Sequence, residues 1–278
     1  MHGRQRHQRQ TNMVAGIPSS LSDLLCQHAP LAIALSGGID SRFLLHAAKL
    51  LGLECIALHA TGSHIAAAET AYAMNFAAQE NCRLLTVPYS PLNFEAIQNN
   101  TKERCYHCKK LLIQRCKQVM VAAHYGEYTL CEGSNYDDTK VFRPGSRALV
   151  EENILSPLLL AHFSKMDIRA SARKTGLPNP EQQPNPCLLT RFAYNTPITI
   201  EKLSLIESLE EQIAKVYKLP FRIRFTPEPL LQCTQNPSNH LELQKIFAQA
   251  GIKNVHMAIT PKISGFFDQH TYPSWPLL

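Results

Sequence analysis

The sequence predicts an α/β fold, a doubly wound parallel sheet followed by a smaller α+β domain. Between residues 31 and 176, short apolar runs alternate with longer segments of helical periodicity. That order is typical of a parallel sheet with helices on both faces. After residue 177 comes a proline-rich stretch, beyond which the pattern changes. The expected parts are a flexible tail at 1–16, an α/β domain at 17–177, a connector at 178–197 and a small domain at 198–278.

In the first domain, short apolar runs predict buried strands, and apolar residues three and four positions apart predict helices. The first run is LAIAL at 31–35, and the helix after it ends near Gly52, a residue type common at helix C-termini. The expected strands are 31–35, 54–60, 83–89, 128–133 and 153–158. The expected helices are 42–52, 65–81, 108–125 and 164–176.

Beyond this domain the pattern is that of a connector, a helix and a β–α–β unit. LPNPEQQPNP holds four prolines in ten residues, so it must be extended and free of helix. Residues 198–217 carry an apolar stripe that predicts an amphipathic helix. FRIRF at 221–225 alternates like an edge strand, and a helix at 240–251 and a strand at 255–260 follow.

The composition excludes several classes of protein. With 45% hydrophobic and 18% charged residues over 278 positions, the chain can bury a core and is not disordered. No apolar run reaches the roughly 18 residues of a membrane-spanning helix, and the N-terminus lacks the apolar stretch of a signal peptide. Nine cysteines, an odd number, argue against a secreted disulfide framework. We therefore expect a cytoplasmic protein without membrane contact.

The net charge of +6 gives little support for nucleic-acid binding. Arg4, Arg6 and Arg9 lie in the tail, and without them the charge is +3. A body so weakly basic lacks the electrostatic footprint of most nucleic-acid-binding domains. The tail has two other interpretations, a start of translation at Met13 and a transit peptide.

The hexapeptide SGGIDS at 36–41 lies between the first strand and the first helix, where a phosphate-binding loop is expected. Gly37 and Gly38 let the backbone approach a ligand closely, and the following helix offers unpaired N–H groups to an anion. Ser36 and Ser41 can donate hydrogen bonds to phosphate oxygens, while Asp40 implies Mg²⁺ or a role in orienting the site. The alternative is a glycine turn in which Asp or Ser caps the helix.

SGGIDS has neither the GK[ST] of a Walker A loop nor the GxGxxG of a dinucleotide-binding fold. It resembles the signature of the PP-loop ATP pyrophosphatases. The resemblance implies an enzyme that transfers AMP from ATP to a substrate, releases pyrophosphate and lets a nucleophile displace the AMP.

Cys105 and Cys108 form a CxxC motif at the expected start of a helix. The helix dipole and the neighbouring Arg104, Lys109 and Lys110 should favour their thiolate form. The motif can be a redox disulfide, a metal site or a structural pair.

A zinc site needs four ligands, and the chain has no second CxxC. With Cys187, which follows the connector, as a third ligand, the CxxC could hold a [4Fe–4S] cluster with one open iron. Such an iron can carry a sulfide or a substrate atom. The other six cysteines are expected to fill the core: Cys26, Cys55, Cys82, Cys116, Cys131 and Cys233.

Further motifs follow the hexapeptide in one order: RCYHCKK, EGSNYDD, RPG, ILSPL, SKMDIR and PCLLTRFAY. Over residues 20–225 this series resembles the LarE family, ATP-dependent sulfurtransferases that make the nickel-pincer nucleotide cofactor. The resemblance implies that ATP adenylates a carboxylate of pyridinium-3,5-biscarboxylic acid mononucleotide. A sulfur nucleophile then converts that carboxylate to a thiocarboxylate.

The resemblance also assigns roles to residues. Cys187 matches the family's sulfur-bearing cysteine, and the presence of Cys105 and Cys108 implies the three-cysteine [4Fe–4S] subtype. Alternation in FRIRF puts both of its arginines on one strand face, as a phosphate grip requires, although a solvated face is the alternative. The implied ligands are Ser36, Gly37, Gly38, Asp40 and Ser41 for ATP, Asp40 and Glu210 for Mg²⁺, and Arg222 and Arg224 for the substrate phosphate.

Three other functions are consistent with these motifs. In the sacrificial subtype Cys187 alone gives up its sulfur and becomes dehydroalanine. A cluster-dependent tRNA thiolase is the second. The third is a divergent paralogue that acts on another carboxylate or binds nucleotide without catalysis, because PEPLLQCT and MAITPKISG depart from the family pattern. The family further implies a homo-oligomer and a sulfur donor, either a protein or free sulfide.

Overall fold

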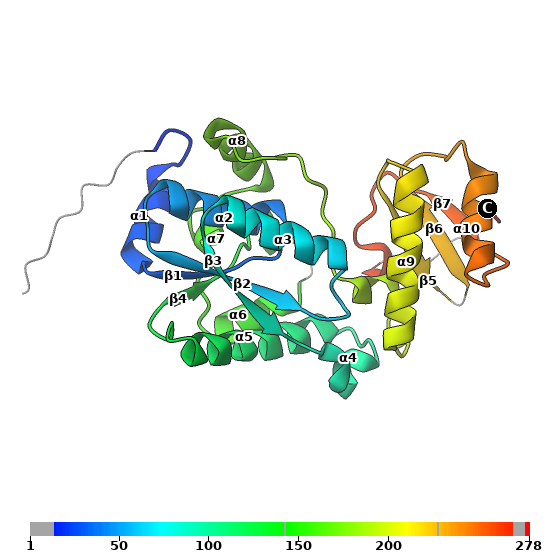
Figure 1. Ribbon diagram of the computed structural model, residues 1–278, viewed down its shortest axis with the longest axis horizontal. Coiled ribbons are helices and arrows are strands. Elements are labelled where there is room, and N and C mark those ends of the chain that lie inside the picture. Colours follow the sequence, from blue (N-terminus) through cyan, green and yellow to red (C-terminus); the bar gives the residue numbers. More distant parts are fainter. Residues whose placement is uncertain (1–13, 142, 227, 269–275) are drawn as a thin grey trace, which may run out of the picture.

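A computed structural model describes residues 14–141, 143–226, 228–268 and 276–278 (Figure 1). It has a parallel four-stranded sheet with helices on both faces and a separate three-stranded sheet toward the C-terminus. The predicted α/β fold with a smaller α+β part is therefore confirmed. Residues 1–13, most of the predicted tail, lie outside the described residues. None of the helices in the described part of the chain is long and apolar enough to cross a bilayer.

The first sheet has the strand order β3–β2–β1–β4, and every neighbouring pair is parallel. Its strands are β1 Leu31–Ala34, β2 Cys55–Thr61, β3 Arg83–Pro88 and β4 Thr129–Cys131. The chain moves outward from β1 to β3 and then returns to the other side of β1. In such sheets ligands bind beyond the carboxyl ends of the strands at this reversal. Residues 36–41 and 132–134 leave the sheet at these ends.

Helices cover both faces of this sheet (Figure 1). One face carries α1 Ser19–His28, α2 Ile39–Leu50, α3 Ala67–Gln79, α7 Pro157–Leu160 and α8 Lys165–Thr175, and the other carries α5 Arg104–Ala122 and α6 Gly145–Glu151. Leu31 and Ile33 enter the core of the first face, whereas Ala32 enters that of the second. This two-sided burial explains why LAIAL is apolar throughout. Short helical segments are Pro91–Asn93, α4 Glu95–Gln98, Tyr136–Lys140, Leu188–Arg191 and Phe266–Asp268.

The second sheet has the order β5–β6–β7, with β5 antiparallel and β7 parallel to β6. Its strands are β5 Phe221–Phe225, β6 Pro229–Cys233 and β7 His256–Ile259, and α9 Ile200–Val216 and α10 His240–Gln249 pack on it. β5 is an edge strand, as predicted. β6 was not predicted, because two prolines of PEPLLQCT precede its apolar residues and proline disfavours a central strand.

Two expectations about this fold are wrong. Residues 153–158 do not form a fifth strand: only Leu155 bridges to Cys131, and Pro157 begins α7. Proline lacks an N–H group and suits the first position of a helix. Cys26, expected in the core, is exposed on α1, and Cys55 is only partly buried. The other four cysteines of that group are buried.

Phe43 tests the core between the first sheet and its helices. Its ring is fully buried and stacks on Phe163 at a centroid distance of 6.2 Å. Phe43→Ala is expected to lower the free energy of unfolding by about 3–5 kcal/mol, because it removes apolar contacts and leaves a cavity. Urea denaturation measures this loss. Phe94→Ala, at a ring that is 41% exposed, is the control; an equal loss in both variants would contradict the assigned core.

Candidate functional site

The 36–41 loop joins β1 to α2, as predicted, but α2 begins at Ile39 and not at residue 42. Asp40 and Ser41 therefore lie in the first helical turn. Gly37 has a φ of +85°, a conformation that favours glycine. Gly38 is the N-cap and no side chain caps the helix, so the alternative of an Asp or Ser cap is wrong. The unpaired N–H groups of the first turn remain available to a ligand.

The two serines of this loop interact with each other. Ser41 Oγ accepts a hydrogen bond from the Ser36 amide at 3.1 Å and donates one to the Gly38 carbonyl at 3.1 Å. The hydroxyls of Ser36 and Ser41 are 3.1 Å apart. Both hydroxyls thus lie beside the N-terminus of α2, where an anion would meet them together with the helix amides.

Asp40 links the loop to two motifs that lie far away in the sequence. Its carboxylate forms an ion pair with Lys165, the first residue of α8. The Lys165 amide in turn donates to Asp137 Oδ2 at 2.8 Å. The next residue, Asp138, pairs with Arg143 at 2.8 Å, and burial raises the pKa of Asp138 in spite of that arginine. Segments of EGSNYDD, RPG and SKMDIR therefore meet beside the 36–41 loop.

The segment after β4 packs tightly on this loop. A β-carbon added to Gly133 would lie 2.8 Å from the amide nitrogen of Ser41, so only glycine fits. Glu132 is buried and accepts hydrogen bonds from the Ser134 amide and hydroxyl, both at 2.9 Å, and from Ser156 Oγ at 2.8 Å. Burial by itself raises the pKa of Glu132, but Lys109, 3.6 Å away, and these hydrogen bonds bring the pKa below its ordinary value.

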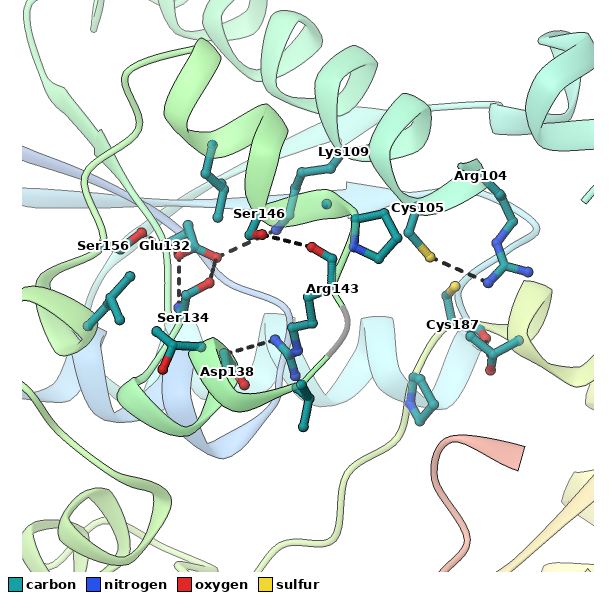
Figure 2. Close-up of a pocket in the computed structure, with 18 of the residues that line it drawn as sticks. Arg104, Cys105, Lys109, Glu132, Ser134, Asp138, Arg143, Ser146, Ser156 and Cys187 are labelled. Atoms are coloured by element: carbon teal, nitrogen blue, oxygen red, sulfur yellow. Dashed lines mark hydrogen bonds and ion pairs between the residues drawn. The ribbon is translucent and has the colours of Figure 1, made fainter. Parts of the chain in front are cut away.

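A cavity of about 960 Å³ extends from this segment to two of the predicted cysteines (Figure 2). Glu132, Ser134 and Asp138 line one end, and Cys105 and Cys187 line the other. Residues 264–268 and Arg224 of the C-terminal part close one wall. Glu132 and Ser134, which line the cavity, flank Gly133, and Gly133 lies against Ser41; this end of the cavity is therefore next to the 36–41 loop, although no residue of the loop lines it.

Cys105 lies in the first turn of α5, and its thiol points toward that of Cys187 across the cavity (Figure 2). Arg104 Nη2 lies 3.4 Å from Cys105 Sγ. Arg104, Lys109 and Lys110 were expected to favour the thiolate form of the two cysteines. For the lysines this is wrong, because Lys109 pairs with Glu132 and Lys110 pairs with Glu151. Arg104 alone of the three contacts a thiol. Burial lowers its pKa, but Cys105 and Cys187 outweigh that effect and the net shift is upward.

Cys108 lies one turn further along α5 and packs against Ile97 and Leu188 in an apolar cluster. Its carbonyl accepts a hydrogen bond from Tyr89 Oη at 3.2 Å. Burial, together with the nearby Cys187 and Cys105, raises the pKa of Cys108 to about 12. The predicted thiolate is therefore wrong for Cys108. Burial also raises the pKa of Cys187, in spite of Arg104.

The donor set at this end of the cavity consists of thiols, the ligands that iron–sulfur clusters use. Cys105 and Cys187 face the cavity, whereas Cys108 does not line it. In the described part of the chain, no group of three or more His, Cys, Asp or Glu side chains is arranged to hold a metal ion. The chemistry of the three thiols fits a cluster, and Cys108 would have to turn toward the cavity to complete the set.

Glu210 lies against a buried arginine that the sequence-based assignment missed. Arg191 is 1% exposed at its side chain, and both of its hydrogen bonds to Glu210 measure 2.9 Å. Glu210 also accepts from the Ile223 amide at 3.0 Å. Arg191 belongs to PCLLTRFAY, so its place in that motif was the signal that could have identified it.

Arg222 and Arg224 lie on β5 near Arg191. Arg224 is 3% exposed, so a solvated strand face is wrong for this residue. It donates to the Thr190 carbonyl and to Gln232 Oε1, each at 2.9 Å, and it lines the cavity. Arg222 donates to the Pro184 carbonyl at 2.6 Å, and its Nε is buried without a partner. Burial, followed by repulsion from Arg191, lowers the pKa of Arg222 to about 10 and that of Arg224 to about 9.

The sequence also gave no signal for an acidic group in the cavity wall. Asp268 lines the cavity, and its Oδ1 accepts a hydrogen bond from Tyr194 Oη at 2.8 Å. Tyr194 lies in PCLLTRFAY, but Asp268 follows no recognisable motif. Folding alone brings the two residues together across 74 positions of sequence.

Curated proteins that resemble this chain come from three organisms. An uncharacterized protein of Methanocaldococcus jannaschii is 32% identical over 196 residues, which are 69% of this chain and 72% of that protein. An uncharacterized protein of Synechocystis is 28% identical over 248 residues, 84% and 90% of the two chains. The pyridinium-3,5-bisthiocarboxylic acid mononucleotide synthase of Lactiplantibacillus plantarum is 29% identical over 195 residues, 69% and 70% of the chains. No protein-family model matches the chain.

Glu132 makes the stability of this site depend on pH. Its folded-state pKa is below the unfolded value of about 4.3, so its contribution is complete above that pH and is lost as the pH falls through the folded pKa. We expect Glu132→Gln to lower the free energy of unfolding by about 1–3 kcal/mol at pH 7. At pH 3 the difference from the wild type should shrink. Urea denaturation at both values tests this, with exposed Glu127→Gln as control; a difference that does not depend on pH would contradict it.

Proposed function

We propose that the chain is a LarE-type, ATP-dependent sulfurtransferase of nickel-pincer nucleotide biosynthesis, and its 29% identity to a pyridinium-3,5-bisthiocarboxylic acid mononucleotide synthase supports this. Its substrate would be pyridinium-3,5-biscarboxylic acid mononucleotide, and the enzyme would convert a carboxylate of this molecule to a thiocarboxylate. The observation that carries the proposal is the shared cavity. Cys105 and Cys187 face it at one end, and its other end lies beside the 36–41 loop. We infer that activation of a carboxylate at the loop and delivery of sulfur from the cysteines take place at neighbouring positions.

The first step requires a nucleotide at the 36–41 loop. The amides of the first turn of α2 and the hydroxyls of Ser36 and Ser41 would bind the phosphates of ATP, and Asp40 would hold Mg²⁺. A substrate carboxylate oxygen attacks the α-phosphorus, and the bond to the β-phosphate oxygen breaks. Pyrophosphate leaves with the bonding electrons, and the product is an acyl-adenylate. Glu210 is the other candidate Mg²⁺ ligand, although Arg191 occupies both of its oxygens in this structure.

The second step requires sulfur at the far end of the cavity. A [4Fe–4S] cluster on Cys105, Cys108 and Cys187 would supply an exchangeable sulfur at its open iron. Sulfide from this source would attack the acyl carbon, the bond to the AMP oxygen would break, and AMP would leave with the bonding electrons. Sulfur competes with water because it is the better nucleophile at neutral pH and the site holds it in place. Arg224, which lines the cavity, and Arg222 would bind the substrate phosphate.

The sacrificial reaction is a second candidate, and one observation favours it. Cys187 lines the cavity, whereas Cys108 is packed in an apolar cluster. In this reaction Cys187 Sγ itself would attack the acyl carbon, the bond to the AMP oxygen would break, and AMP would leave a thioester on Cys187. The Cβ–Sγ bond then breaks as a base removes the α-proton, which leaves the thiocarboxylate and a dehydroalanine. Only one cysteine is consumed.

Cys187→Ala separates the two steps of the proposal. We expect it to abolish formation of the thiocarboxylate while pyrophosphate release with ATP and the pyridinium substrate persists, because the phosphate-binding loop is untouched. Chromatography of product and a pyrophosphate assay measure both. Exposed Cys26→Ser is the control and should keep both activities. Sulfur transfer by Cys187→Ala would refute the role of this cysteine.

A single turnover of the wild type distinguishes the two sulfur sources. After one turnover, intact-protein mass spectrometry should show no change if a cluster delivers the sulfur. A loss of about 34 Da at Cys187 would identify the sacrificial reaction.

Gly133→Ala tests whether ATP binds at the 36–41 loop. The new β-carbon would collide with the Ser41 amide, and overpacking of this kind costs about 1–3 kcal/mol. We expect weaker ATP binding by about tenfold, measured by calorimetry. Gly126→Ala, where the nearest atom to the β-carbon is a Val121 methyl at 3.4 Å, is the matched control. Equal affinities for the two variants would place the nucleotide elsewhere.

A further inference from the structure

Arg104 connects the two segments that carry the cavity cysteines. It is the first residue of α5, and its side chain is buried. Nη1 donates to the Leu189 carbonyl at 3.0 Å and to Asn100 Oδ1, while Nη2 lies 3.4 Å from Cys105 Sγ. Leu189 follows Cys187 by two positions. One planar guanidinium therefore bridges the CxxC helix and the segment of Cys187.

A carboxylate neutralises the charge of Arg191, but none neutralises the charge of Arg104 within the described residues. Arg191 is buried to a similar degree and pairs with both oxygens of Glu210. In the part of the chain that the structure describes, no carboxylate forms an ion pair with Arg104; its partners are an amide oxygen, a carbonyl, a thiol and the ring of Tyr194, whose centroid lies 5.9 Å from the guanidinium carbon. A buried cation without an anion is costly. Anionic sulfur at the thiol end of the cavity would remove that cost.

We propose that Arg104 is a positioning residue that holds Cys105 opposite Cys187 and provides the positive charge for anionic sulfur between them. This inference rests on the proposed sulfur transfer. The sulfur can be a cluster sulfide or a thiolate, since a guanidinium recognises either by charge and by an N–H group directed at sulfur. The forked guanidinium is essential, because Nη2 contacts Cys105 Sγ while Nη1 donates to the Leu189 carbonyl.

A bridging reagent measures the geometry without any need for activity. The full-length, reduced and metal-free chain is treated with dibromobimane, which becomes fluorescent when it links two neighbouring thiols, and peptide mass spectrometry maps the Cys105–Cys187 link. In Arg104→Gln and Arg104→Lys we expect bridging about tenfold slower than in the wild type, as expected for loss of a charged hydrogen bond. Arg115→Gln is the matched control, because Arg115 lies on the same helix well beyond Cys105, is exposed, and donates a hydrogen bond to the Gln118 side chain.

Arg104→Lys decides the result if Arg104→Gln does not fold, since lysine keeps the charge and the apolar stem but lacks the fork. Folded Arg104→Lys that bridges at the wild-type rate overturns the positioning role. A wild-type chain that forms no Cys105–Cys187 link overturns it as well.

Anaerobic reconstitution with iron and sulfide supplies the second readout. Loss of the cation in Arg104→Gln should lower the reduction potential of the bound cluster, because the reduced form carries one more negative charge, and Arg104→Lys should restore it. An unchanged potential in Arg104→Gln overturns the charge role. If the wild type binds no iron, the cluster proposal fails, while the bridging rates still decide whether Arg104 positions the two cysteines.

Discussion

The buried pair of Arg191 and Glu210 holds the segment on which the site depends. Arg191 also donates to the Pro186 carbonyl at 2.9 Å and to Thr190 Oγ1 at 3.0 Å, so the chain around Cys187 folds about its guanidinium. Glu210 belongs to α9, which packs on the second sheet and also on the Leu188–Arg191 segment that follows Cys187. Because removal of one partner from a buried ion pair typically costs about 3–5 kcal/mol, this pair anchors Cys187 firmly to the C-terminal part.

The other end of the cavity depends on the topology of the first sheet. The reversal of strand order brings the ends of β1 and β4 side by side, and Gly133 allows the two following segments to touch. Lys165 of α8 then reaches Asp40. Neither contact follows from nearness in the sequence. These two contacts fix the end of the cavity near the first sheet. The Arg191–Glu210 pair fixes the end near Cys187.

Buried arginines lie at the thiol end of this cavity, whereas Glu132 and Asp138 line its other end. Arg104 and Arg224 line the cavity, and Arg191 lies behind its wall. The positive charges of these arginines favour an anionic ligand. The proposed nucleotide substrate and the proposed sulfur nucleophile are both anionic. Burial, followed by repulsion from Arg191 and Arg222, lowers the pKa of Arg224 to about 9, so a bound anion would stabilise this part of the fold.

The sequence alone determined the α/β class, the position of the 36–41 loop and the placement of Cys105 at the start of a helix, because these follow from local periodicity, glycine and apolar runs. It failed at 153–158, where Pro157 overrode an apolar run, and at β6, which becomes a central strand only by pairing with β5 and β7. Tertiary structure decided that Cys105 and Cys187 share a cavity and that the partly buried Cys108 packs in an apolar cluster instead. Burial and long-range pairing depend on which surfaces meet, and no local pattern encodes that choice.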